Sequence, residues 1–163
     1  MGADAERYLL RTGTLERLFN RAFGLALRFG IGLSHNYLLQ VRGRNSGKLY
    51  STPVDVLDLD GKRFLVCGRG RTQWVRNAEA SGEVTLAKGV RRETFSVRQV
   101  PVEERPRVLK AYLDRFKLTV QRYFPVSAGS AESDFVPYAS RYPVFYMESR
   151  AKRSSDSSDS DRQ

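Results

Sequence analysis

A short basic turn carries the residues of this 163-residue chain that are best suited to chemistry. The segment Gly43–Lys48 (GRNSGK) lies between an apolar run that ends at Val41 and an alternating run that begins at Val54. A strand that ends in a glycine-flanked turn with Arg, Lys and Ser side chains offers backbone N–H groups and positive charge together. The turn therefore predicts a site for a phosphate or carboxylate group.

A second basic segment, Gly68–Arg71 (GRGR), directly follows the strand predicted at residues 63–67. A glycine-rich strand end that leads into a helix again directs N–H groups and positive charge outward. The lone tryptophan, Trp74, lies just beyond this segment and offers a flat surface for an aromatic ring. The alternative is that Trp74 anchors a short helix on the core and that Arg76 is a solvated charge.

Several kinds of catalytic site are excluded by the residues present. The chain has one histidine, His35, and one cysteine, Cys67, whereas a zinc site built from Cys and His needs three or four such ligands. We expect a loop or capping role for His35, because no glycine-flanked nucleophile elbow lies nearby, and a buried, inert thiol for Cys67. No Walker sequence, GxGxxG turn or pair of catalytic carboxylates appears. If the chain is an enzyme, its chemistry therefore belongs to a bound cofactor.

The elements that must position these segments follow from the periodicity of the apolar residues. Asp60-Gly61 predicts a tight hairpin, because glycine accepts the positive φ that a two-residue turn requires. Hairpins without βαβ repeats predict an α+β fold, in which a mainly antiparallel sheet of about six strands closes into a small barrel with peripheral helices. The predicted strands are 37–42, 51–59, 63–67, 83–88, 91–100 and 144–147, and the predicted helices are 5–30, 73–80, 101–116 and 131–141.

Three parts of the chain differ in composition. Residues 1–34 hold the predicted N-terminal amphipathic helix, whose basic face suits either an anionic membrane or the surface of its own domain. Residues 35–149 form the predicted cofactor-binding barrel domain. Residues 150–163 are rich in Ser, Asp and Arg, and we expect this tail to be disordered, because it has too little apolar surface to bury.

The net charge of +10 favours an anionic partner, which could be nucleic acid, an acidic membrane surface or an anionic cofactor. A single cysteine fits a reducing compartment. No run approaches the roughly twenty apolar residues of a membrane span, and the N-terminus does not read as a signal peptide. We expect a cytoplasmic protein, with peripheral membrane contact through the N-terminal helix as an open alternative.

The order of the motifs resembles the deazaflavin (F420)-dependent nitroreductase and quinone reductase family. The resemblance rests on GR-x-SG at residues 43–47, Thr52-Pro53, the Asp60-Gly61 hairpin, the glycine turn at residues 68–70, Trp74 with Asn77, and the final strand after Pro143. It implies a split β-barrel, often dimeric, that binds coenzyme F420 with its phosphate and polyglutamate tail. The implied reaction is hydride transfer from the reduced deazaflavin to a quinone, a nitro compound or another electron-poor acceptor.

The resemblance also implies which residues hold the cofactor. The expected cofactor-binding residues are Arg42, Arg44, Ser46, Gly47, Lys48, Thr52, Pro53, Gly68, Arg69, Gly70, Trp74 and Asn77. Asn45 stands where the family usually has a lysine, and Tyr50 where it usually has an arginine. Tyr138 and Tyr142 are the candidates for a substrate-side tyrosine, and both are also plausible packing residues.

The sequence is also compatible with other functions. Basic charge with interleaved Tyr and Phe would suit a barrel that stacks on single-stranded nucleic acid, although no sequence signature of specific binding is present. Related split barrels bind FMN or haem, so FMN is the alternative cofactor. A barrel that carries its ligand without turnover is the third possibility.

Overall fold

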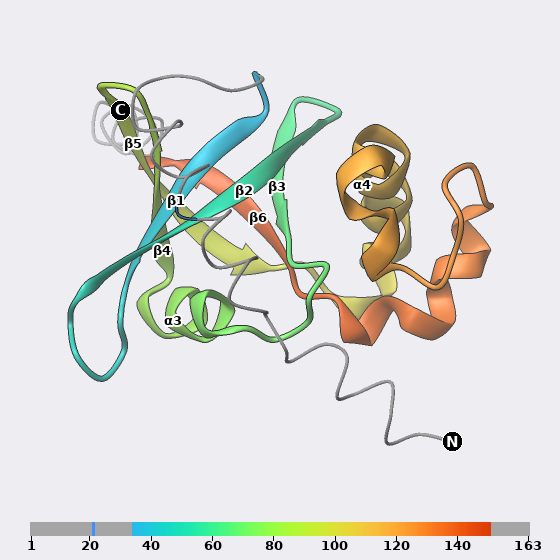
Figure 1. Ribbon diagram of the computed structural model, residues 1–163. Helices are drawn as coiled ribbons and strands as arrows, with labels where there is room; N and C mark the ends of the chain where they lie inside the picture. The colour runs from blue at the N-terminus through green and yellow to red at the C-terminus, as the bar shows by residue number, and fades with distance from the viewer. Residues whose placement is uncertain (1–20, 22–33, 151–163) are drawn as a thin grey trace, which may run out of the picture.

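The computed structural model describes residue 21 and residues 34–150 (Figure 1). The predicted N-terminal helix and the predicted disordered tail lie outside these residues, apart from residue 21 and Arg150, and the proposed division into three parts stays a prediction. Within the described residues, no helix is long and apolar enough to cross a membrane.

A closed barrel of six antiparallel strands forms the centre of the described chain. The strand order is β1-β2-β3-β6-β5-β4, and β4 pairs with β1 to close the barrel. The predicted α+β barrel is therefore confirmed. The strands are β1 (Asn36–Arg42), β2 (Leu49–Leu59), β3 (Lys62–Val66), β4 (Glu83–Lys88), β5 (Arg91–Gln99) and β6 (Val144–Ser149).

Alternation along the strands fills the barrel with apolar side chains. Leu39, Val56, Leu65 and Phe145 belong to one buried cluster inside it. The Asp60-Gly61 hairpin between β2 and β3 is confirmed, since both residues have positive φ (51° and 72°), as a two-residue turn of this hand requires. β2 begins at Leu49, two residues before the predicted start, so the basic turn between β1 and β2 is short.

A layer of helices lies beside β2 and β3, and α4 is its longest member (Figure 1). Helix α4 (Arg105–Val120) follows a short 3-10 helix, η1 (Val102–Glu104), and precedes another, η2 (Gln121–Tyr123). It begins later than predicted and runs four residues past the predicted end at Phe116. The helix predicted over residues 131–141 is present as the 3-10 helix η3 (Glu132–Arg141), which contains Pro137.

Helix α3 (Gln73–Ser81) closes one end of the barrel, where β1, β3 and β5 end (Figure 1). Val75 and Ala78 are buried and belong to the inner apolar cluster. The helix ends at Gly82, whose φ of 69° is favourable for glycine and whose N–H donates to the Ala78 carbonyl. Both basic segments predicted from the sequence therefore lie next to one helix.

Candidate functional site

The Gly43–Lys48 turn joins β1 to β2 and is built around two glycines. The Gly47 N–H donates to the Gly43 carbonyl at 2.8 Å, and Gly47 has a φ of 67°. A Cβ atom on Gly43 would lie 2.6 Å from Cε2 of Tyr50, so a larger residue there would displace the tyrosine ring. The turn is therefore shaped by glycine on one side and Tyr50 on the other.

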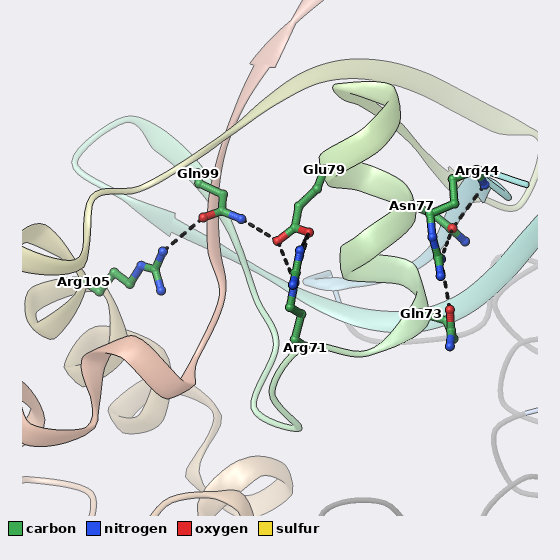
Figure 2. A network of polar contacts seen from close by, with 7 residues as sticks. All are labelled: Arg44, Arg71, Gln73, Asn77, Glu79, Gln99 and Arg105. Carbon is green, nitrogen blue, oxygen red and sulfur yellow. Dashed lines mark hydrogen bonds and ion pairs between the residues drawn. The ribbon is translucent and has the colours of Figure 1, made fainter.

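Arg44 attaches this turn to α3. Its backbone N–H donates to Asn77 Oδ1 at 3.2 Å, and its Nη1 donates to the same oxygen at 2.9 Å. Nη1 also donates to Gln73 Oε1 at 3.0 Å, so two residues one helical turn apart hold one guanidinium (Figure 2). Asn77 is 5% exposed. Its amide thus holds an exposed cation at a fixed point on the helix.

The electrostatics of the turn are unbalanced. Within residues 34–150, no carboxylate forms an ion pair with Arg42, Arg44 or Lys48. The Arg42 side chain donates to the Gly47 carbonyl at 3.2 Å, and the oxygens that hold Arg44 are neutral amides. Three positive charges therefore gather without a compensating negative charge, as an anion site requires.

Ser46 has its hydroxyl within the turn itself. It accepts the Lys48 backbone N–H and lies 3.3 Å from the hydroxyl of Tyr50, which is half exposed. Sequence reasoning noted Tyr50 only as a departure from the family pattern and missed Gln73 as a partner of Arg44. The signal for Gln73 was its position four residues before Asn77 on a predicted helix.

The Gly68–Arg71 segment leads from β3 into α3 through Thr72, the residue before the helix. Gly70 has a φ of 76°, and its carbonyl accepts the Thr72 N–H at 2.9 Å. A Cβ atom on Gly68 would lie 3.2 Å from Cβ of Tyr123, so the chain passes close to η2 at this point. Arg69 is half-buried. The prediction that this turn lies beside the N-terminus of a helix is met.

Trp74 is partly buried and packs against the inner apolar cluster. Its ring lies 5.9 Å from that of Phe145, with the two planes tilted by 48°. This contact anchors α3 on the barrel, which is the alternative that the sequence left open. A second role beside a cofactor ring stays a prediction.

Two further predicted cofactor-binding residues lie on β2. Thr52 and Pro53 pair with Leu39 and Leu38 of β1, and both are half-buried. They are part of the sheet, with no hydrogen bond to the basic turn among the described contacts.

The two candidate tyrosines both pack in the helical layer. The Tyr142 hydroxyl donates to the Tyr123 carbonyl at 2.8 Å, and its ring stacks on Phe124 at 4.5 Å. Burial raises the pKa of Tyr142, which disfavours a phenolate. Tyr138 is half-buried, with the Arg141 guanidinium 5.5 Å from its ring. A substrate-side role for either tyrosine stays a prediction.

The structure adds a polar cluster that the sequence did not indicate. His35 Nε2 lies 3.7 Å from Asp55 Oδ1, and the His35 ring lies 4.7 Å from that of Phe116. Burial raises the pKa of Asp55, an effect opposed by His35 and by hydrogen bonds from Asn36 and Thr119. The two residues are twenty positions apart, so only the pairing of β1 with β2 brings them together.

A chain of polar contacts also lies on the opposite side of α3 from Arg44 (Figure 2). Arg71 Nη2 donates to Glu79 at 2.6 Å, and Gln99 Nε2 donates to the other carboxylate oxygen at 2.6 Å. Arg105 Nη2 in turn donates to Gln99 Oε1 at 3.3 Å. This chain links the second basic segment to α3, the end of β5 and the start of α4.

Residues 19–123 match the sequence profile described as F420H(2)-dependent quinone reductase. No curated protein sequence matches the chain.

Solved structures provide a comparison of the fold. A structure described as an F420-H2 dependent reductase (FDR-A) is 20% identical over 71% of this chain and 95% of its own, with a TM-score of 0.47. One described as a domain-swapped dimer is 19% identical over 82% of this chain and 93% of its own, with a TM-score of 0.50. The heme storage protein HutZ from Vibrio cholerae is 10% identical over 83% and 90%, with a TM-score of 0.51. At these identities the last two indicate the fold alone.

The six antiparallel strands, with α3 at one end of the barrel, define a split-barrel protein. Because the matched profile covers most of the chain, the protein belongs to the F420H(2)-dependent quinone reductase family. It is therefore an F420H2-dependent oxidoreductase, and the resemblance drawn from the sequence is confirmed.

Proposed function

We propose that this oxidoreductase passes a hydride from reduced F420 to a quinone-type acceptor, and that the Gly43–Lys48 turn holds the anionic part of the cofactor. The observation that carries the placement is the uncompensated charge of Arg44, which Gln73 and Asn77 fix in position with neutral oxygens. The name of the family supports the class of acceptor. A nitro compound is the alternative acceptor.

The residues of the turn fit such a cofactor. Phosphate and carboxylate groups need several donors and positive charge, which Arg42, Arg44 and Lys48 supply on one short segment. The Lys48 side chain is exposed and has no ion-pair partner among the described residues. When bound, the deazaflavin would supply two-electron hydride chemistry.

The chain contributes orientation and charge. Asn77 Oδ1 accepts hydrogen bonds from both the backbone N–H and the guanidinium of Arg44. The Arg44 side chain therefore has little conformational freedom to lose when the cofactor binds. Gly68, Gly70 and Trp74 lie at the start of the same helix and would form the wall near the ring. The glycines of the two turns have no Cβ atom, which allows the cofactor to approach the backbone closely.

We also propose a homodimer, which is supported by the similar fold that is described as a domain-swapped dimer. Light scattering coupled to size exclusion tests it directly. A single species at the mass of one 18.6 kDa chain would contradict the dimer.

The cofactor assignment is tested by fluorescence titration of the purified protein with F420, with FMN titrated in parallel. We expect saturable F420 binding that Lys48→Glu weakens and Arg115→Glu does not, because Arg115 is an exposed arginine on α4 outside the site. Equal affinities in the two variants would contradict the placement on this turn. Tighter binding of FMN than of F420 would contradict the cofactor itself.

A further inference from the structure

A pocket of about 360 Å³ is lined by Arg71 and Glu79, which lie on the side of α3 opposite Arg44 (Figure 2). Its polar lining comes from five elements and connections: the turn before α3, α3 itself, the end of β5, the start of α4 and the end of η3. The polar residues in the lining are Arg71, Glu79, Gln99, Arg105, Ser140 and Arg141. None of the predicted cofactor-binding residues lines it.

Arg105 is a buried cation without an ionic partner. It is 7% exposed, and within residues 34–150 no carboxylate forms an ion pair with it. Its Nε donates to the Val100 carbonyl at 2.8 Å, and its Nη1 lies 3.2 Å from the Tyr142 carbonyl and 3.4 Å from that of Ala139. Nη2 donates only to Gln99 Oε1. A guanidinium has five N–H groups, so one on Nη2 is left for a ligand.

The charges around Arg105 do not balance. Arg71 and Glu79 form an ion pair, so their charges cancel. Arg141 is exposed, and its one described contact is the ring of Tyr138. Two positive charges, those of Arg105 and Arg141, therefore face the pocket without a negative partner. Burial lowers the pKa of Arg105, an effect opposed at a distance by Glu103, so a negative charge placed beside the guanidinium would stabilise it.

We propose that this pocket binds an oxyanion, a phosphate or carboxylate group, through Arg105 and Arg141 with the Ser140 hydroxyl beside them. The site goes beyond the proposed function, because it lies across α3 from the basic turn. Arg105 is the fixed donor, since its other hydrogen bonds hold the plane of the guanidinium, and Arg141 is the exposed charge that attracts the anion.

Calorimetric titration of the full chain with inorganic phosphate tests the site. We expect saturable binding at millimolar concentrations or below, weakened roughly threefold or more by Arg141→Gln, as loss of one partly exposed charge implies. The Arg141 side chain makes no hydrogen bond to the described residues, so this variant should fold normally. The matched control is Arg115→Gln, which removes the same charge from α4 away from the pocket and should leave the affinity within about twofold.

Glu79→Gln gives a change in the opposite direction. It removes the one negative charge in the pocket while keeping an oxygen for Arg71, so phosphate should bind roughly threefold more tightly. Absence of saturable phosphate binding would overturn the proposal. So would an affinity unchanged by both Arg141→Gln and Glu79→Gln.

Two sources could supply the oxyanion, and F420 with and without its polyglutamate tail separates them. If the tail reaches the pocket, Arg141→Gln weakens only the tailed form, and phosphate competes with it. If the ligand is a free small anion, both forms bind the variant as they bind the wild type, and phosphate binds alongside. Failure of F420 to bind at all would contradict the proposed function and leave the phosphate result standing.

Discussion

The two sides of α3 hold arginines in opposite ways. On one side Arg44 donates to the neutral amide oxygens of Gln73 and Asn77, at 3.0 and 2.9 Å. On the other side Arg71 donates to the carboxylate of Glu79 at 2.6 Å (Figure 2). Both contacts fix a basic segment to the same helix. Only the second cancels the charge of the arginine that it fixes.

This difference separates a contact that leaves a positive charge available to a ligand from a contact that neutralises the charge. A carboxylate partner makes a stronger contact but neutralises the charge of the guanidinium. An amide partner positions the guanidinium and leaves its charge available to a ligand. The side chains on α3 thus determine which of the two basic turns can attract an anion. Three of the following experiments, Arg44→Glu, Asn77→Asp and Glu79→Gln, each change one residue of these two contacts.

Removal of the uncompensated charge should have the largest effect. Arg44→Glu reverses the charge at the centre of the proposed cofactor site. We expect the Kd for F420 to rise roughly a hundredfold, because the variant loses a charge-assisted contact and adds a repulsion between like charges. Fluorescence titration measures it. The matched control across the helix is Arg71→Gln, for which the Kd should stay within about twofold of the wild type. Equal losses in both variants would show that the two sides of α3 do not differ in function.

Asn77→Asp should make the first side resemble the second. The new carboxylate would face both the backbone N–H and the guanidinium of Arg44 and would neutralise its charge. We expect F420 affinity to fall roughly tenfold while Tm is kept, because the buried carboxylate gains a paired cation. Titration and a thermal melt of the same sample give both values. Unchanged affinity would mean that the charge of Arg44 is not what the cofactor uses.

The sequence was sufficient for the barrel and for the position of the basic turns, because alternation and the Asp60-Gly61 hairpin are local signals. The partners on α3 were not accessible in this way. Arg44 and Asn77 are 33 residues apart, and their contact exists only because α3 closes the end of the barrel at which β1 ends. The buried Arg105 was hidden for the same reason, since its acceptors lie on β5, η3 and the connections between elements.

Glu79→Gln should make the second side resemble the first, with a smaller effect. The amide keeps an oxygen for Arg71 but loses the ionic character of that contact, so we expect a small fall in Tm and an F420 affinity within about twofold of the wild type. Differential scanning fluorimetry with a parallel titration measures both. A large loss of F420 affinity would contradict a purely structural role for the Arg71–Glu79 ion pair.

Asp55 provides a reference for stability that is independent of α3. Because burial raises its pKa in the folded state above the ordinary value of 3.8, the folded chain binds its proton more tightly than the unfolded chain does. The free energy of unfolding of the wild type should therefore fall, relative to Asp55→Asn, as the pH rises through that raised pKa. Denaturant unfolding of both proteins at a series of acidic pH values tests this. The groups that face the Asp55 carboxyl are His35, Asn36 and Thr119. A difference that is constant with pH would contradict it.

The burial of Cys67 has a practical consequence. It is the single cysteine of the chain, it is 5% exposed, and burial raises the pKa of its thiol. Thiol-reactive dyes should therefore leave the native protein unlabelled, because the thiolate is the reacting form. A cysteine introduced at Val90, which is 97% exposed beside Gly89 in the β4–β5 hairpin, would take a single dye without removal of the native residue. The wild-type sequence is thus a suitable background for labelling at an introduced cysteine.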